Sequence, residues 1–135
     1  MFEISTVRSR PMLYIVTSAP DRSSSISSTI KSSLEQVRQF MREHGVVADG
    51  EAIAVLTDWT GRLVTIEAGY PIGSAVPSLL DTRVQAGRTP GGLAASVDVG
   101  ESSIDHSSLH QRLAVDLRAA GHLLTGVAWE AYAPE

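Results

Sequence analysis

The sequence contains no cysteine. This absence excludes disulfide bonds, thiolate nucleophiles, iron–sulfur clusters and zinc sites built from cysteine. Lysine occurs once, as Lys31, and the 11 Lys and Arg residues are outnumbered by 15 Asp and Glu residues, which gives a formal net charge of −4. Proteins that bind nucleic acid through its phosphates usually present a basic face. We therefore expect no direct binding of nucleic acid.

Long apolar runs are also missing. No run approaches the roughly 20 residues of a membrane-spanning helix, and residues 1–12 hold no continuous apolar segment of the secretory type. We therefore expect a cytoplasmic chain with no membrane contact. Aromatic residues make up only 5% of the chain, so each Trp and Tyr is a candidate for a specific role.

What is present suffices for one folded domain. The chain has 135 residues, 43% of them hydrophobic and 19% charged, which is an ordinary globular composition. A chain of this length buries about two thirds of its surface without help from metal or disulfide. We expect a single domain over residues 1–135.

Hydrophobic periodicity predicts two helices. One apolar stripe runs through Ile26, Ile30, Leu34, Val37 and Met41, and a second through Leu109, Leu113, Leu117 and Ala120. We expect serines 23–25 to cap the first helix, and an S-x-x-D capping box at Ser102 and Asp105 to open the second. Gly45 and Gly121 are the expected stops.

Strands are predicted around these helices. β-forming runs cover residues 11–17, 52–58, 63–67, 83–85, 93–99 and 127–133, with a hairpin turn at 60–62. The halves 1–75 and 76–135 share the order helix, glycine, short loop, glycine, strand. We expect an α+β fold of duplicated β-α-β-β units, the second without its final strand. The units should form an antiparallel sheet with two helices on one face and a ligand cleft on the other.

The order of motifs resembles the GyrI-like (gyrase-inhibitor-like) effector-binding domains. These domains serve AraC- and MerR-type transcription regulators and also occur as stand-alone proteins. The matching segments are PMLYIVTSAP, MREHGV, VTIEAGYPIG and VAWEAYA, which together span nearly the whole chain. The resemblance implies paired units around a small-molecule cleft, with a last-strand glutamate, here Glu130, facing it. The helix starts, APDRS and GESS, depart from the family's G-P-Y-like pattern, so no pocket aromatic is expected there.

The last predicted strand carries the leading site candidates. Alternation along a strand places Glu130 and Tyr132 on one face and Trp129 on the other. If Trp129 packs on the helices, Glu130 and Tyr132 face the cleft, where a carboxylate attracts cations. A solvated acid is the alternative.

Other residues are candidates for the cleft wall. Tyr14, Trp59 and Tyr70 offer aromatic contact area suited to a multidrug-type pocket, and Glu67 offers a second acid. For all three aromatics a role in the core or in loop anchoring competes with this interpretation, most of all for Trp59 beside a turn, and for Glu67 simple surface exposure does.

No motif predicts a metal or a cofactor. His106 and His110 have the spacing of two metal ligands, but no third ligand is visible. No G-x-G-x-x-G or phosphate-loop pattern occurs, and no G-x-S-x-G elbow.

Three functions therefore stay open. The first is a stand-alone binder of amphipathic, cationic small molecules, acting as an effector sensor or sequestering protein in transcription regulation. The second is a hydrolase of reactive small molecules, with Glu130 activating water and Tyr132 positioning the substrate. The third is an inhibitory protein-interaction module, which would have no enclosed pocket. A homodimer and a regulatory protein partner are both compatible with the sequence.

Overall fold

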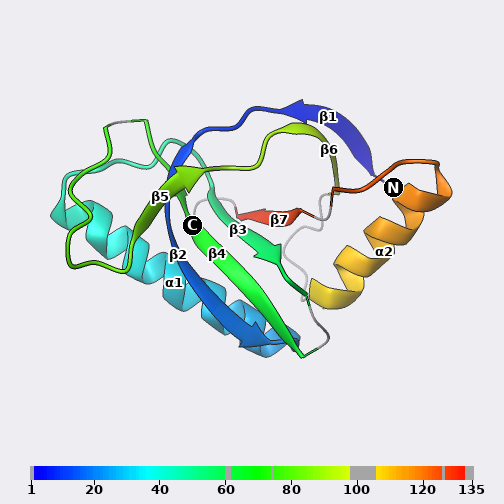
Figure 1. The fold of residues 1–135 in the computed structure, drawn as a ribbon, viewed down its shortest axis with the longest axis horizontal. Coiled ribbons are helices and arrows are strands. Elements are labelled where there is room, and N and C mark those ends of the chain that lie inside the picture. Colours follow the sequence, from blue (N-terminus) through cyan, green and yellow to red (C-terminus); the bar gives the residue numbers. More distant parts are fainter. Residues whose placement is uncertain (1, 60–61, 74, 98–105, 126, 133–135) are drawn as a thin grey trace.

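The computed structural model describes residues 2–59, 62–73, 75–97, 106–125 and 127–132. The elements in chain order are β1 (Glu3–Val7), β2 (Pro11–Pro20), α1 (Ser23–Glu43), β3 (Ala52–Thr57), β4 (Leu63–Pro71), β5 (Gln85–Arg88), β6 (Gly92–Ser96), α2 (His106–Ala119) and β7 (Ala128–Tyr132). The fold class is α+β, as the sequence predicts (Figure 1). In the described part of the chain, neither helix is long and apolar enough to cross a membrane.

The strands form two sheets. Five strands pair in the order β5-β2-β4-β3-β7, and β1 pairs with β6 in a separate two-stranded ribbon. Every described strand pair is antiparallel. The ribbon arches from the β2–β5 end of the larger sheet toward α2 (Figure 1). The sequence did not predict β1, whose residues are mostly exposed.

One face of the larger sheet packs against α1. The helix buries Ile26, Ile30, Val37 and Met41, which confirms its predicted stripe, and Leu34 is half-buried. These side chains pack on alternate residues of the strands, such as Leu13 and Ile15 of β2 and Leu56 of β3. This layer contains most of the buried hydrophobic residues.

Helix α1 ends just before the predicted glycine, but its start is not capped as predicted. Arg22 is the N-cap of α1, and no side chain caps it, so the serine caps are wrong. Gly45 has a φ of +66°, and the N–H of Val46 donates to the carbonyl of Met41 at 2.9 Å. This bond closes the helix by the glycine-assisted route expected for such a stop. The predicted α2 capping box, Ser102 and Asp105, lies outside the described residues, as does part of the 60–62 turn.

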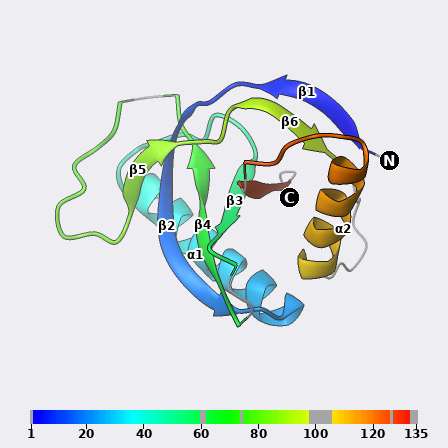
Figure 2. The ribbon, with the colours of Figure 1, turned by 45° about the vertical axis from the view of Figure 1, so that its right-hand side comes forward.

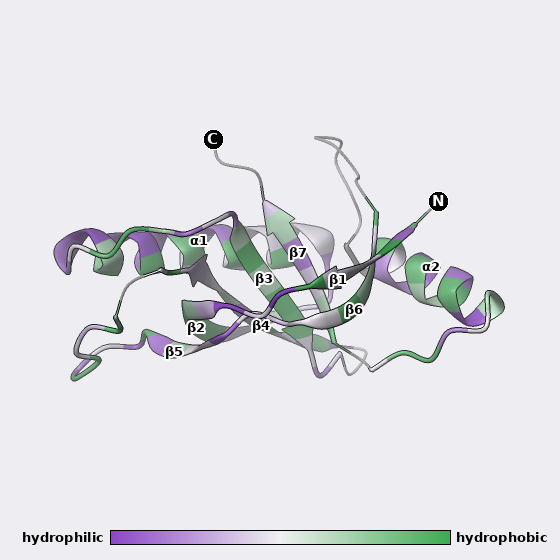
Figure 3. Cartoon of the chain, turned by 90° about the horizontal axis from the view of Figure 1, so that it is seen from above, coloured by the Kyte–Doolittle hydropathy of each residue, from purple (hydrophilic) through white to green (hydrophobic). Residues whose placement is uncertain are grey.

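The second helix does not lie beside α1 on the sheet. It stands beyond β3 and β7, away from most of α1 (Figures 2 and 3). Its stripe residues Leu109, Leu113 and Leu117 line a cavity that also reaches Met12 and Val55, on the sheet face opposite α1. The prediction of two helices on one face is therefore wrong for α2. The apolar stripe of α2 faces apolar residues across the cavity and does not pack on the sheet face that α1 covers.

The strand pairing does not show the predicted duplication. In the first half, β4 lies between β2 and β3 and joins them. No described strand takes that central place in the second half. As a result β6 and β7 do not pair with each other: β6 pairs with β1, and β7 extends the first half's sheet at β3.

Candidate functional site

A large cavity lies between the larger sheet, the β1–β6 ribbon and α2. Its volume is about 1870 Å³. Apolar side chains from all three parts line it, among them Val55 of β3, Leu93 of β6, Leu113 of α2 and Trp129 of β7. Such a volume exceeds the roughly 300–1,000 Å³ of typical small-molecule pockets, so there is room for a ligand with accompanying water.

The β2 strand explains why the sheet offers an apolar surface on both sides. Leu13 and Ile15 point into the core under α1, whereas Met12 and Tyr14 lie in the cluster on the opposite face. Both faces of this part of β2 are therefore apolar. The second face, with Met12 and Tyr14, forms part of the cavity lining.

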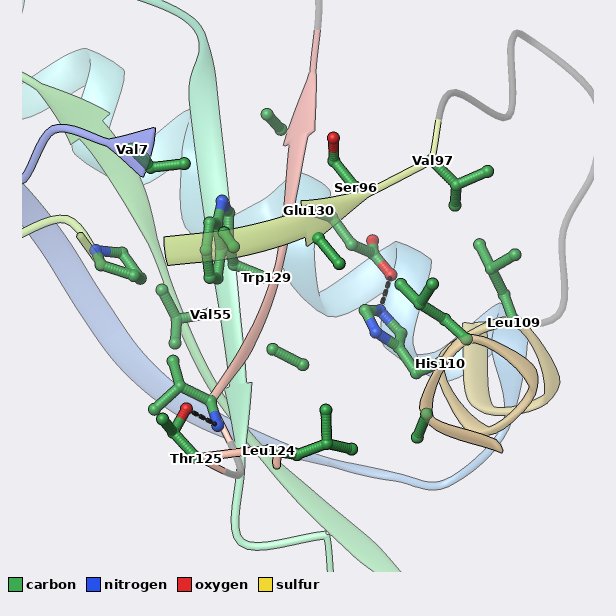
Figure 4. Close-up of a pocket in the computed structure, with 18 of the residues that line it drawn as sticks. Val7, Val55, Ser96, Val97, Leu109, His110, Leu124, Thr125, Trp129 and Glu130 are labelled. Atoms are coloured by element: carbon green, nitrogen blue, oxygen red, sulfur yellow. Dashed lines mark hydrogen bonds and ion pairs between the residues drawn. The ribbon is translucent and has the colours of Figure 1, made fainter. Parts of the chain in front are cut away.

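The two faces of β7 are the reverse of the expected arrangement. Trp129 packs with Met12 and Val55 on the cavity face of the sheet, whereas Tyr132 packs with the core residues on the α1 face. Glu130 points the same way as Tyr132. It still lines the cavity, because β7 is the edge strand of the sheet and the cavity continues around it to α2. Figure 4 shows Glu130 turned toward His110 and Trp129 turned toward Val55 and Val7.

Glu130 is the centre of a small polar cluster. Its Oε2 lies 2.9 Å from Nε2 of His110 on α2, and its Oε1 accepts a hydrogen bond from the hydroxyl of Tyr132. The side chains of His110 and Glu130 are only 16% and 11% exposed. Both carboxylate oxygens therefore have a partner, one on α2 and the other on β7 itself.

Tyr132 is a fixed donor in this cluster. Burial, followed by the charge of Glu130 and the hydrogen bond to it, raises the pKa of Tyr132 well above its ordinary value of 10. The hydroxyl therefore keeps its proton throughout the physiological range and donates it to the carboxylate.

The Trp59 side chain completes the cluster from the loop after β3. Its ring centroid lies 5.5 Å from that of His110, at an interplanar angle of 57°. Its indole N–H is buried with no hydrogen-bond partner among the described residues, which is uncommon for a buried donor. Trp59 is thus not a wall of the cavity, as the sequence suggested, but a neighbour of the residue that contacts Glu130.

The remaining predicted wall residues separate into two groups. Tyr14 and Glu67 line the cavity on the sheet face. Burial and then the charge of Glu67 raise the pKa of Tyr14. Tyr70 instead lies in the core under α1, where its hydroxyl accepts a hydrogen bond from Arg38 at 2.8 Å. Its expected place in the cavity wall is therefore corrected to a place in the core.

His110 is a member of this cluster that the sequence did not place in the site. Its spacing from His106 is that of two metal ligands, but the sequence shows no third ligand, so two ordinary histidines at the start of a helix are the preferred interpretation of the sequence. Among the described residues, no group of three or more acidic, His or Cys side chains converges on one point. The actual partner, Glu130, follows 20 residues later in the chain. No spacing rule links a helix residue to a residue on the next strand, so the sequence offered no direct signal for this pair.

The cavity thus combines apolar walls with a carboxylate that can pair with a cation and a tyrosine that stays protonated. Neither models of known protein families nor curated proteins give a match to this chain. Its function has to be inferred from the chemistry of the site.

Proposed function

We propose that the chain binds small amphipathic cations in this cavity, as a stand-alone effector sensor or sequestering protein. The observation that carries the proposal is the carboxylate of Glu130, which is 11% exposed and lines a cavity with largely apolar walls. A charge in such surroundings interacts with an opposite charge more strongly than it does in water.

The walls suit the rest of such a ligand. Val55, Leu93 and Leu113 provide apolar contact, and Tyr14 and Trp129 provide aromatic faces, which attract cations as well as apolar groups. Glu67 adds a second negative charge on the same lining. The motif order that resembles the GyrI-like effector-binding domains supports the same function.

Calorimetric titration with a matched pair of probes tests the proposal. Benzyltrimethylammonium carries a charge that does not depend on pH, and neopentylbenzene is its neutral carbon isostere. At pH 8 we expect the cation to bind to the wild type, and Glu130→Gln to weaken it by about 1–4 kcal/mol, the range for two unit charges roughly 4 Å apart between bulk water and a partly buried site, roughly 5- to 1,000-fold in Kd. Neopentylbenzene should be affected little, because the substitution keeps the shape of the side chain.

Glu35→Gln is the matched control. Glu35 is exposed on α1 and is not among the residues that line the cavity, so the same change of charge there should leave both affinities unaltered. Equal losses for both probes in Glu130→Gln would mean that Glu130 shapes the site without selecting charge. Unchanged binding of the cation would contradict the proposal.

The contacts of Glu130 also favour a second candidate, hydrolysis of a reactive small molecule. A carboxylate bonded to an imidazole can accept a proton from water, and a tyrosine that keeps its proton can donate to a leaving oxygen. Glu130, His110 and Tyr132 have these relations. Opening of styrene oxide to its diol that depends on Glu130 would identify an enzyme. Binding without turnover would leave the first proposal.

A further inference from the structure

Apolar side chains that are exposed to solvent gather around the cavity. In the described part of the chain 12 large hydrophobic side chains are exposed. Six of them line this one cavity, namely Ile4, Leu93, Val97, Leu123, Leu124 and Val127. Exposed apolar surface that is gathered in one place marks a site for another molecule. The cavity therefore offers apolar surface that the folded chain itself does not cover.

A compact cation fills only part of this space. The cavity volume of about 1870 Å³ exceeds the roughly 300–1,000 Å³ of a typical small-molecule site. Water does not suit the apolar remainder, because a bound water needs about two to four polar partners and the lining is largely apolar. A ligand that fits the whole cavity therefore has a large apolar part besides its charged group.

Two elements indicate the length of this apolar part. On α2, Leu109, Leu113 and Leu117 line the cavity, and the run from the first to the last is about 12 Å long at the helical rise. On β6, Leu93 and Val97 also line it, and they lie roughly 13 Å apart along the strand. An alkyl chain advances roughly 1.2 Å per carbon, since the three backbone bonds of an extended residue span about 3.6 Å. Each run therefore matches a chain of about ten carbons.

We infer that the ligand of this cavity is a single-chain amphiphile whose unbranched alkyl chain, of about ten carbons, lies against α2 and β6. Figure 4 shows Val97 and Leu109 on one side of the pocket and Val55 and Trp129 on the other, so the chain has apolar neighbours on both sides. The cationic head group rests on the proposed function, whereas the tail follows from the size and apolarity of the cavity. The ligand is a single dispersed molecule and not a bilayer surface, because these residues line a concavity between three parts of the fold.

Calorimetry with n-alkyltrimethylammonium ions from butyl to tetradecyl, each below its critical micelle concentration, tests the inference. We expect the affinity to rise by about twofold to fourfold per methylene up to decyl, where fourfold corresponds to complete burial, and to change little beyond dodecyl. Binding should saturate at one chain per protein. An affinity that does not depend on chain length would overturn the inference, and so would uptake of many chains without saturation.

Two exposed leucines form a matched pair of substitution sites. Leu93 on β6 lines the cavity and is 77% exposed, whereas Leu80, between β4 and β5, is 84% exposed and is not among the lining residues. Because both side chains are exposed, replacement by glutamine should leave the fold intact. Leu93→Gln should weaken decyltrimethylammonium by about threefold to tenfold and butyltrimethylammonium little, because the lost contact is with the tail. Leu80→Gln should change neither affinity. Equal losses in the two variants, or no loss in Leu93→Gln, would contradict the inference.

A series of neutral n-alkyl glucosides separates the tail from the charge. The gain in affinity per methylene should be the same as in the cationic series, because contact of the tail does not depend on the head group. If Glu130→Gln binds the cations as the wild type does while the gain per methylene persists, the proposed function fails and this inference stands. If benzyltrimethylammonium binds and chain length has no effect in either series, this inference alone fails. Binding of the protein to phosphatidylcholine vesicles without binding of the dispersed amphiphiles would assign the apolar surface to a membrane and overturn the inference.

Discussion

The two helices carry similar apolar stripes but have different surroundings. On α1, six residues are buried against the sheet. On the described part of α2, Leu117 alone is buried, and Leu113 is half-buried at the cavity. A stripe packed against strands contributes its full transfer free energy to stability, whereas one that lines a cavity keeps part of that free energy available to a ligand. The same kind of stripe thus packs into the core on α1 and lines a cavity on α2.

The largest difference should come from a large-to-small substitution on α1. Ile30 is 3% exposed in the core between α1 and the sheet. Ile30→Ala should lower the free energy of unfolding by about 2–5 kcal/mol, because it removes buried methyl groups and leaves a void. Urea denaturation of the variant and the wild type measures this. A loss below about 1 kcal/mol would contradict the dense packing on this side.

A smaller loss of stability is expected at Tyr132, which lies between the α1 layer and the cavity. Its hydroxyl donates to the charged Glu130, so Tyr132→Phe should cost about 1.5–3 kcal/mol near neutral pH. Because the pKa of Tyr132 is raised in the folded protein, its contribution is complete below the unfolded value of about 10 and declines as the pH rises through the folded value.

Denaturation of wild type and Tyr132→Phe at several pH values from 7 to 11 tests both the loss of stability near neutral pH and its decline at high pH. The stability difference between wild type and Tyr132→Phe should be constant up to about pH 9 and should shrink above about pH 10. A difference that grows at high pH would have the wrong sign for a raised pKa and would contradict the hydrogen bond.

The smallest effect should follow from Leu113→Ala on α2. Because Leu113 is half-buried at the cavity, the loss of stability should be about 1 kcal/mol or less, while binding of neopentylbenzene should weaken. Leu117→Ala is the control on the same helix, since Leu117 is 8% exposed, and it should cost more. A loss for Leu113→Ala as large as that for Ile30→Ala would place this face of α2 in a packed core.

The α1 layer was predictable because its pattern is local. The period of Ile26, Ile30, Val37 and Met41 identifies both the helix and its buried side, and the strand at Ala52–Thr57 is apolar up to its last residue. The sequence also predicted that residues 128–132 alternate. Neither pattern determines which element packs against a given face. The predicted position of α2 and the predicted direction of Trp129 were therefore wrong.

The site was predictable only in part, for the same reason. The alternation of the last strand and the resemblance to the GyrI-like domains together point to Glu130, but its contact with His110 depends on where α2 stands relative to β7. The aromatic ring of Tyr70 suits a pocket, and for that reason the sequence predicts it in the cavity wall. Its neighbour across the strand pair is Leu13, which faces α1, and that register is a tertiary property.

The strand pairing also has a consequence for the order of events in folding. Glu3 of β1 pairs with Ser96 of β6, and Ala52 of β3 pairs with Tyr132 of β7. Closing such long loops is slow compared with forming a helix or a hairpin. The α1 layer depends mainly on elements from the first half of the chain, whereas the ribbon, α2 and β7 come later. During synthesis, the cavity should therefore be completed only after the α1 layer has been made.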